Sequence, residues 1–394
     1  MKLLKISFDH LRMFESGTFE IDLFASDKVP TGDESVAPLA GRIYSNNILG
    51  FAGINASGKT TALALIELAA RIVEGSPLPG GGLPSTIATF FDGPARLRCL
   101  VGEGEACFLI ESTIACESEA ISGENSLVFG DERISFVSAK SLRRADLFSW
   151  EVLADRARLL YRRSQMDEPW LALASPEVSI SGAVIAKEFG GRRRIHVFRD
   201  NKFNLSRDFT GLDTVLRVFD PTIEHLEVAS DGRAFSAKFK GREPIVLSED
   251  GLAEVLSSGT HRGVALIGRA ISALRAGGYL LVDEIENHLN RQLVNVVIDL
   301  FVSAETNPRG ATLVFTTHYP QLLDHIHRKD NVYFLASTFG NGSRVVKYST
   351  QVKRIENKKS EVFVSNFVKG TAPRYVDVKS LVKLVAGEVS SDGR

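Results

Sequence analysis

The segment from Gly53 to Thr61 carries residues suited to holding a polyphosphate. Gly53 to Thr60 match G-x-x-x-x-G-K-[ST], between a short apolar run and a helical pattern. In such a loop, glycines let backbone N–H groups point at phosphate oxygens, and the following helix N-terminus adds favourable partial charge. We expect Lys59 to reach the β- and γ-phosphates of a bound nucleotide and Thr60 to offer its hydroxyl to Mg²⁺. The other predicted nucleotide-binding residues of this loop are Gly53, Asn55, Ala56, Ser57, Gly58 and Thr61.

Acidic and imidazole side chains follow two apolar runs further along the chain. Asp283 and Glu284 come directly after residues 279–282, and His318 follows residues 311–315 and two threonines. A carboxylate at a strand end can hold Mg²⁺ opposite Thr60, which is the role we expect for Asp283. We expect Glu284 to orient and deprotonate the attacking water, and His318 to bond the γ-phosphate.

A second anion site is expected at the start of the helical pattern over Thr260–Ala276. Ser257, Ser258 and Gly259 place a hydroxyl and small-residue N–H groups at that helix N-terminus. One chain does not need two phosphate cradles for one nucleotide. The sequence therefore predicts that this tip covers the γ-phosphate bound in another copy of the protein.

The elements that must position these groups alternate between strands and helices. Period-two segments predict an opening hairpin (3–8 and 18–23) and two later hairpins, 96–101 with 106–114 and 127–129 with 133–137. Apolar runs predict buried strands at 47–52, 279–282 and 311–315, followed by strands at about 331–337 and 343–349. Helical spacing covers 60–73, 260–276 and 292–302. These patterns predict an α/β fold with a mixed central sheet, an antiparallel β subdomain and a helical lid, the site lying along one sheet edge.

Composition excludes several classes of protein. The chain has 394 residues, and its 47 basic and 48 acidic residues give a net charge of −1, unlike a histone-like nucleic-acid binder. Three cysteines cannot build a disulfide framework, and Arg269 and Arg275 interrupt the longest apolar stretch, so we expect a cytoplasmic protein without membrane spans. Residues 138–207, a basic and partly helical insertion, hold 14 Lys/Arg against 8 Asp/Glu. That excess is typical of a solvated face, or of a surface for phosphate or a partner.

With these motifs in this order, the chain resembles ABC-class ATPases, and within them the heads of the SMC, RecF and OLD group. It is most similar to small prokaryotic AAA-type ATPases related to OLD proteins, many of them encoded in anti-phage or abortive-infection loci. The resemblance implies one P-loop NTPase head over residues 1–394 that binds ATP and Mg²⁺. It implies a Walker A motif at Lys59 and Thr60, a Walker B motif at Asp283 and Glu284, a signature at Ser257 and Gly259, a D-loop from Asn287 to Asn290, and a switch histidine at His318. Gln165 is the Q-loop candidate by elimination only.

The resemblance implies an ATP-hydrolysing switch in which two copies sandwich ATP and control an effector protein or DNA, in anti-phage defence. Two alternatives stay open: a repair or recombination ATPase that binds DNA directly, and the ATPase subunit of an OLD-type nuclease. The nuclease would have to be on another polypeptide, because only 76 residues follow His318 and a metal nuclease needs clustered carboxylates. A transporter subunit is disfavoured by the 198 residues between Lys59 and Ser257, and long coiled-coil arms by the lack of heptads.

Overall fold

The computed structural model describes residues 1–78, 85–118, 125–166, 175–200, 212–228, 234–338, 340, 342–352 and 357–391. Its centre is a six-stranded sheet in the order β10-β14-β15-β5-β16-β17, parallel except for β17. The strands are β5 (Ile48–Gly53), β10 (Val197–Arg199), β14 (Tyr279–Val282), β15 (Thr312–Thr317), β16 (Val332–Ser337) and β17 (Ser343–Lys347). The carboxyl ends of β5, β14 and β15 therefore share one edge, as the sequence predicts.

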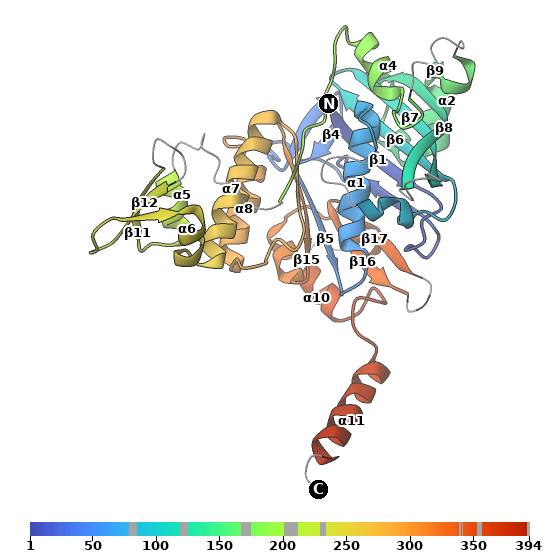
Figure 1. Cartoon of the computed structure of the whole chain (residues 1–394). Helices are drawn as coiled ribbons and strands as arrows, with labels where there is room; N and C mark the ends of the chain where they lie inside the picture. The colour runs from blue at the N-terminus through green and yellow to red at the C-terminus, as the bar shows by residue number, and fades with distance from the viewer. Residues whose placement is uncertain are drawn as a thin grey trace.

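The strands of this sheet are apolar at successive positions rather than at alternate ones, so side chains on both faces need to be covered. Leu281 on β14 packs in the same cluster as helix α1 (Lys59–Glu74) and the antiparallel sheet. Its neighbour Leu280 packs on the opposite face with α7 (Ser258–Ala276) and α8 (Arg291–Val302). Figure 1 shows α1 on one side of β5, and α7 and α8 on the other.

The second sheet is antiparallel, in the order β2-β1-β6-β7-β8-β9. Its strands are β1 (Lys2–Phe8), β2 (Phe19–Asp22), β6 (Ala95–Glu103), β7 (Ala106–Ser118), β8 (Asn125–Ser138) and β9 (Arg158–Arg162). The opening hairpin and the β6–β7 hairpin are confirmed. The hairpin predicted around Gly130 and Asp131 is wrong: β8 is one strand paired with both β7 and β9, and an irregular register between Ser112 and Ile114 accommodates the two residues.

A small unit with its own core precedes α7 and was not predicted from the sequence. It consists of α5 (Leu212–Phe219), β11 (Ile223–Val228), β12 (Ala234–Phe239), β13 (Ile245–Ser248) and α6 (Glu249–Val255). Its buried core includes Leu216, Phe235 and Leu252, together with Val264 of α7. It lies beside α7, away from the antiparallel sheet (Figure 1). The unit thus supports the N-terminal half of α7, where the serine-glycine tip lies.

The basic segment 138–200 is built into both sheets through its edge strands β9 and β10. Its other elements are η2 (Ala139–Ser141), η3 (Arg144–Phe148), α2 (Trp150–Arg156), η4 (Arg163–Gln165) and α4 (Ser181–Glu188). Several of its arginines face carboxylates: Arg163 and Glu132 form a buried pair at 2.8 Å, and Arg162 pairs with Asp131 at 2.7 Å. Part of the positive charge is therefore used internally. Residues 167–174 and 201–207 of the predicted insertion lie outside the described residues.

The C-terminal part ends in a helix that projects from the rest of the molecule (Figure 1). After η5 (Pro320–His325) come α9 (Tyr348–Gln351), α10 (Lys359–Val364) and α11 (Tyr375–Ser391). The remaining elements are β3 (Val36–Ala40), β4 (Ile43–Asn46) and η1 (Ser85–Phe90). Within the described ranges, we find no helix with the length and apolar character needed to span a bilayer.

Candidate functional site

The loop between β5 and α1 has the backbone of an anion cradle. Ala56 and Gly58 take left-handed conformations, with φ of +58° and +85°. A Cβ at Gly53 would lie 2.2 Å from Ser57 Oγ, so the close approach of the two loop ends requires glycine there. Asn55 and Ala56 are exposed, whereas the Ser57 hydroxyl is buried and has no hydrogen-bond partner among the described atoms. This geometry fits a bound phosphate chain.

The Lys59 ammonium is folded back onto its own loop. Its Nζ donates to the carbonyl oxygens of Gly53 and Ile54, both at 3.0 Å, and lies 3.4 Å from His318 Nδ1. Burial lowers the pKa of Lys59, and the nearby carboxylates of Asp283 and Glu284 oppose that effect. A charged phosphate oxygen is a stronger acceptor than a neutral carbonyl, so these contacts are ones that a nucleotide can replace.

Asp283 lies between two threonine hydroxyls from different elements. Thr60 Oγ1, on α1, donates to Asp283 Oδ2 at 2.6 Å, and Thr316 Oγ1, on β15, donates to Asp283 Oδ1 at 2.5 Å. Mg²⁺ prefers oxygen ligands and keeps several waters, so one carboxylate and one hydroxyl beside a phosphate site fit that ion. The structure therefore brings together Thr60 and Asp283, the two residues that the sequence analysis assigned to the metal.

The Glu284 carboxylate has two hydrogen-bonding neighbours. His318 Nε2 lies 3.0 Å from Glu284 Oε1, and Asn287 Nδ2 donates to Oε2 at 2.8 Å. The hydrogen bond from His318 lowers the pKa of Glu284, partial burial opposes it, and the Asn287 bond adds to the lowering. The backbone N–H of His318 donates in turn to Glu286 Oε1 at 2.6 Å. Glu284 and His318 therefore lie together, in the positions that a base and its orienting partner need.

The backbone of Glu284 explains how adjacent residues 283 and 284 both face the site. Its φ is +49°, which is unusual for a residue with a side chain. Its N–H donates to Thr316 Oγ1 at 2.8 Å, so one buried hydroxyl on β15 binds both the Asp283 side chain and the Glu284 backbone. Sequence reasoning did not assign Thr316 a role, because its only signal was its position two residues before His318.

The serine-glycine tip lies at the same sheet edge as Asp283 but on the outer surface. Ser257 caps α7 by accepting from the Thr260 N–H at 3.1 Å, and Ser258 Oγ lies 3.3 Å from His288 Nδ1. A Cβ on Gly259 would come within 2.5 Å of the His288 carbonyl oxygen. Ser257 and Ser258 are both exposed. The tip is thus fastened to the loop after Asp283 while its serines remain accessible.

Arg262 and Asp200 join this arrangement and were not among the predicted site residues. Arg262 Nη2 donates to the carbonyl oxygens of Asp283 and Glu284, both at 3.2 Å, and pairs with Asp200 Oδ2 at 3.0 Å. Burial raises the pKa of Asp200, and the Arg262 guanidinium opposes the rise. The two residues fasten α7 to the end of β14. Asp200 directly follows the short strand β10, which is a weak signal in the sequence.

Gln165 lies on a different element from the residues of the site. It is the exposed last residue of η4, which follows β9 at the edge of the antiparallel sheet. The described hydrogen bonds of Lys59, Asp283 and Glu284 are made with other residues. The described contacts of the site therefore do not support Gln165 as the Q-loop residue.

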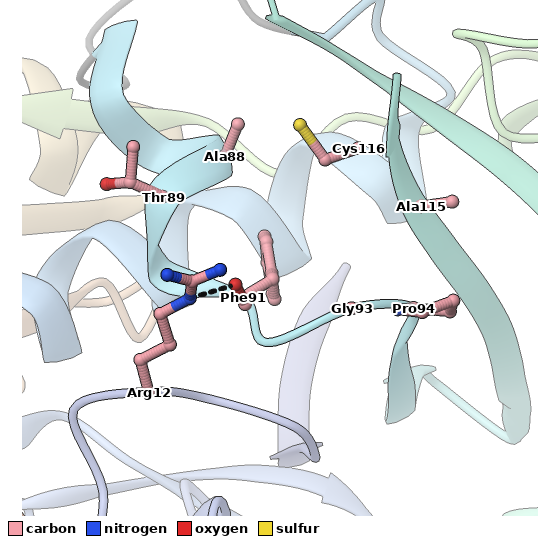
Figure 2. Close-up of a pocket in the computed structure, with 8 residues that line it drawn as sticks. All are labelled: Arg12, Ala88, Thr89, Phe91, Gly93, Pro94, Ala115 and Cys116. Atoms are coloured by element: carbon pink, nitrogen blue, oxygen red, sulfur yellow. Dashed lines mark hydrogen bonds between the residues drawn. The ribbon is translucent and has the colours of Figure 1, made fainter. Parts of the chain in front are cut away.

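A cavity of about 490 Å³ borders the cradle. It is lined by Gly53, Ile54 and Asn55, by His318, and by Phe363, Pro373, Arg374 and Asp377 of the C-terminal part. Figure 2 shows another cavity, of about 380 Å³, between the loop at Arg12, η1 and β7, where Arg12 Nε donates to Phe91 O at 2.7 Å. The described lining residues of this second cavity include neither a carboxylate nor a histidine. Of the two, the first is therefore the one that adjoins the cradle and His318.

Comparison with known families agrees with the geometry. A family model described as "AAA domain, putative AbiEii toxin, Type IV TA system" matches residues 48–324, which is more than half of the chain. The match begins at β5 and ends within η5, so it contains the cradle, the α7 tip, Asp283, Glu284 and His318. No curated protein matches the chain.

Proposed function

The chain belongs to this family of P-loop ATPases, and we propose that it hydrolyses ATP at a site shared between two copies. In this proposal the cradle of one copy binds ATP, and Ser257 to Gly259 of the other cover its γ-phosphate. The observation that carries the proposal is that the capped tip of α7 faces outward at the edge that holds the acid–base groups. Its exposed serines are accessible to a second molecule.

Symmetry makes the arrangement economical. In a two-fold dimer each surface meets the same surface of its partner, so a half-site on each copy is completed twice. The cradle follows β5, and the tip is fastened to the loop after β14, its neighbour but one in the sheet. Arg262 supports the shared geometry, because it fixes α7 to the backbone of Asp283 and Glu284 within one copy.

The residues of the site divide the chemistry among them. Lys59 leaves the Gly53 and Ile54 carbonyls for the phosphates, and Thr60 and Asp283 hold Mg²⁺, which neutralises charge on the phosphate oxygens when bound. Glu284 accepts a proton from the attacking water as the water oxygen bonds to the γ-phosphorus and the bond to the ADP oxygen breaks. His318, bonded to Glu284 and close to Lys59, orients that carboxylate and contacts the γ-phosphate.

Coupling of hydrolysis to an effector protein is the output we propose, within anti-phage defence of the abortive-infection type. The family description supports this choice because it names a toxin of a toxin–antitoxin system. Internal pairing of arginines such as Arg162 and Arg163 reduces the charge that segment 138–200 could offer to DNA. Direct binding of DNA in repair would instead show affinity that falls steeply as salt rises.

Mixing two inactive variants tests the shared site. Lys59→Ala destroys the cradle, and Ser257→Arg blocks the tip with a bulky side chain at an exposed position. In a mixed dimer one site receives both defects and the other receives neither, so random exchange should restore about a quarter of the wild-type ATPase rate. Each variant alone serves as the control. No recovery after verified subunit exchange would contradict the shared site, whereas undiminished activity of Lys59→Ala would contradict the nucleotide assignment itself.

A further inference from the structure

The cavity beside the cradle has a wall that the proposed hydrolysis does not use. Pro373, Arg374 and Asp377, where α11 begins, line it together with Gly53 to Asn55. Arg374 and Asp377 form a two-pronged ion pair, with Nε to Oδ2 at 2.7 Å and Nη2 to Oδ1 at 2.9 Å. Among the described residues that line this cavity, Arg374 is the one with a permanent positive charge.

The chain is anchored to the body shortly before this ion pair. Asn366 Oδ1 accepts from the N–H groups of Gly370 and Thr371, at 3.0 and 3.1 Å. The Gly370 carbonyl accepts from the Ser337 N–H of β16 at 3.0 Å. Gly370 has φ of +97°, and a Cβ there would lie 2.1 Å from the Ser337 carbonyl oxygen. The loop therefore holds a defined position up to Thr371.

Beyond the ion pair, α11 is largely exposed. Its apolar side chains are exposed along its length, including Tyr375 at 77%, Leu381 at 60% and Val389 at 71%. Figure 1 shows the helix projecting away from α10. The short stretch from Pro373 to Asp377 thus joins an anchored loop to a projecting helix, and it borders the cavity beside the cradle.

We propose that Arg374 exchanges Asp377 for the terminal phosphate of ATP, so that the root of α11 responds to the bound nucleotide. This inference rests on the proposed binding of ATP in the cradle. The guanidinium fork that fits a carboxylate also fits a phosphate, with the same two-pronged geometry. Both partners of the present ion pair are about half exposed, so the bond between them is weak and easily exchanged.

The charge of Asp377 favours its separation from Arg374 when a phosphate is bound. Its carboxylate lines the same cavity, so a phosphate beside it would be repelled while Arg374 is attracted. Asp377 belongs to the first turn of α11, and a shift of this residue carries the helix with it. ADP lacks the terminal phosphate and leaves the ion pair in place. The response of α11 should therefore distinguish ATP from ADP.

Two single variants of the ion pair separate this proposal from a structural role. Both remove the same bond, so a structural role predicts the same direction of change in nucleotide affinity. The proposed exchange of partners predicts that the two variants change the affinity for the ATP analogue in opposite directions. Arg374→Ala should weaken binding of the β,γ-imido analogue of ATP about five- to tenfold, because a charge-assisted bond to phosphate is lost. Asp377→Asn should strengthen that binding about two- to fivefold, because the competing carboxylate is removed.

Calorimetric titration of the full chain with the analogue and with ADP, both with Mg²⁺, measures these affinities. ADP affinity should change less than about twofold in either variant, because Arg374 contacts only the terminal phosphate. Amide hydrogen exchange over residues 375–391 should change with the analogue in the wild type and not in Arg374→Ala. The proposal would be overturned if both variants weakened binding of the analogue equally. It would also be overturned if amide hydrogen exchange over residues 375–391 were the same with the analogue and with ADP. Lys59→Ala is the control for the proposed function: unchanged affinity for both nucleotides there would refute the cradle rather than the sensor.

Discussion

Replacing Thr316 with valine removes one hydroxyl and almost nothing else. Valine has nearly the shape of threonine and suits a strand, and Thr316 is fully buried in β15. Yet this hydroxyl donates to Asp283 Oδ1 and accepts from the Glu284 N–H. The substitution therefore leaves a charged acceptor with one partner fewer and a backbone donor without its partner, at a residue with positive φ.

The size of the effect can be worked from these two bonds. A hydrogen bond to a charged group contributes about 1.5–3 kcal/mol, and an unsatisfied buried donor costs about 1–3 kcal/mol. Burying the added methyl group returns roughly 0.8 kcal/mol. We expect the free energy of unfolding to fall by about 2–5 kcal/mol. Because Asp283 and Glu284 lose their common support, kcat should fall on the order of 100-fold.

Thr312 provides a matched control on the same strand. It is also fully buried, four residues earlier on the same face, and its hydroxyl donates to the Asn46 carbonyl at 3.0 Å. Thr312→Val should cost about 0.5–1.5 kcal/mol of stability and leave kcat within about twofold of wild type. Steady-state ATPase assays and urea unfolding of the three proteins give both quantities. A Thr316→Val variant with wild-type kcat, or a Thr312→Val variant with an equal loss, would refute the reasoning.

Three further variants, a control substitution and a pH–rate profile test other parts of the site. Glu284→Gln should retain ATP binding but lose about 10²- to 10⁴-fold in kcat and accumulate a dimer with ATP, measured by light scattering; wild-type turnover would remove the base assignment. The pKa of Glu284 lies below the ordinary value of a glutamate, so its carboxylate stays ionised near neutral pH and is protonated only when the pH falls through the lowered pKa. A pH–rate profile should therefore show a kcat that does not depend on Glu284 near neutral pH and that declines only in acid. Lys59→Ala should weaken ATP binding by at least about tenfold in calorimetry, since the cradle loses its cation. Gly259→Ala should lower the ATPase rate, because the added Cβ would lie 2.5 Å from the His288 carbonyl oxygen. Gly268→Ala on the same helix is the control: its Cβ meets open space, and the free energy of unfolding should rise by about 0.5–1 kcal/mol. Equal ATPase rates for the two variants would contradict this prediction.

Local patterns in the sequence predict the structure of the segments around Gly53, Asp283 and His318 well, because each depends on its own backbone. The spacing of Gly53, Gly58 and Lys59 specifies a cradle whose conformation these residues themselves permit. Apolar runs that end in Asp283 and before His318 indicate strands whose polar ends share an edge, which the order β14-β15-β5 confirms. The turn expected at Gly130 failed for the opposite reason, since pairing of β8 on both sides outweighs a local preference for a turn.

Other parts of the site depend on contacts between segments that are distant in sequence. Arg262 reaches the backbone of Asp283 only because α7 crosses the end of β14, and Asp200 meets Arg262 because β10 pairs with β14. Thr316 supports Asp283 from the neighbouring strand, and Arg374 borders the cradle from the far end of the chain. Such contacts depend on strand order and helix placement, which periodicity and turn residues in the sequence do not predict. The residue types and their local conformation therefore belong to the sequence, while their mutual support was decided by tertiary packing.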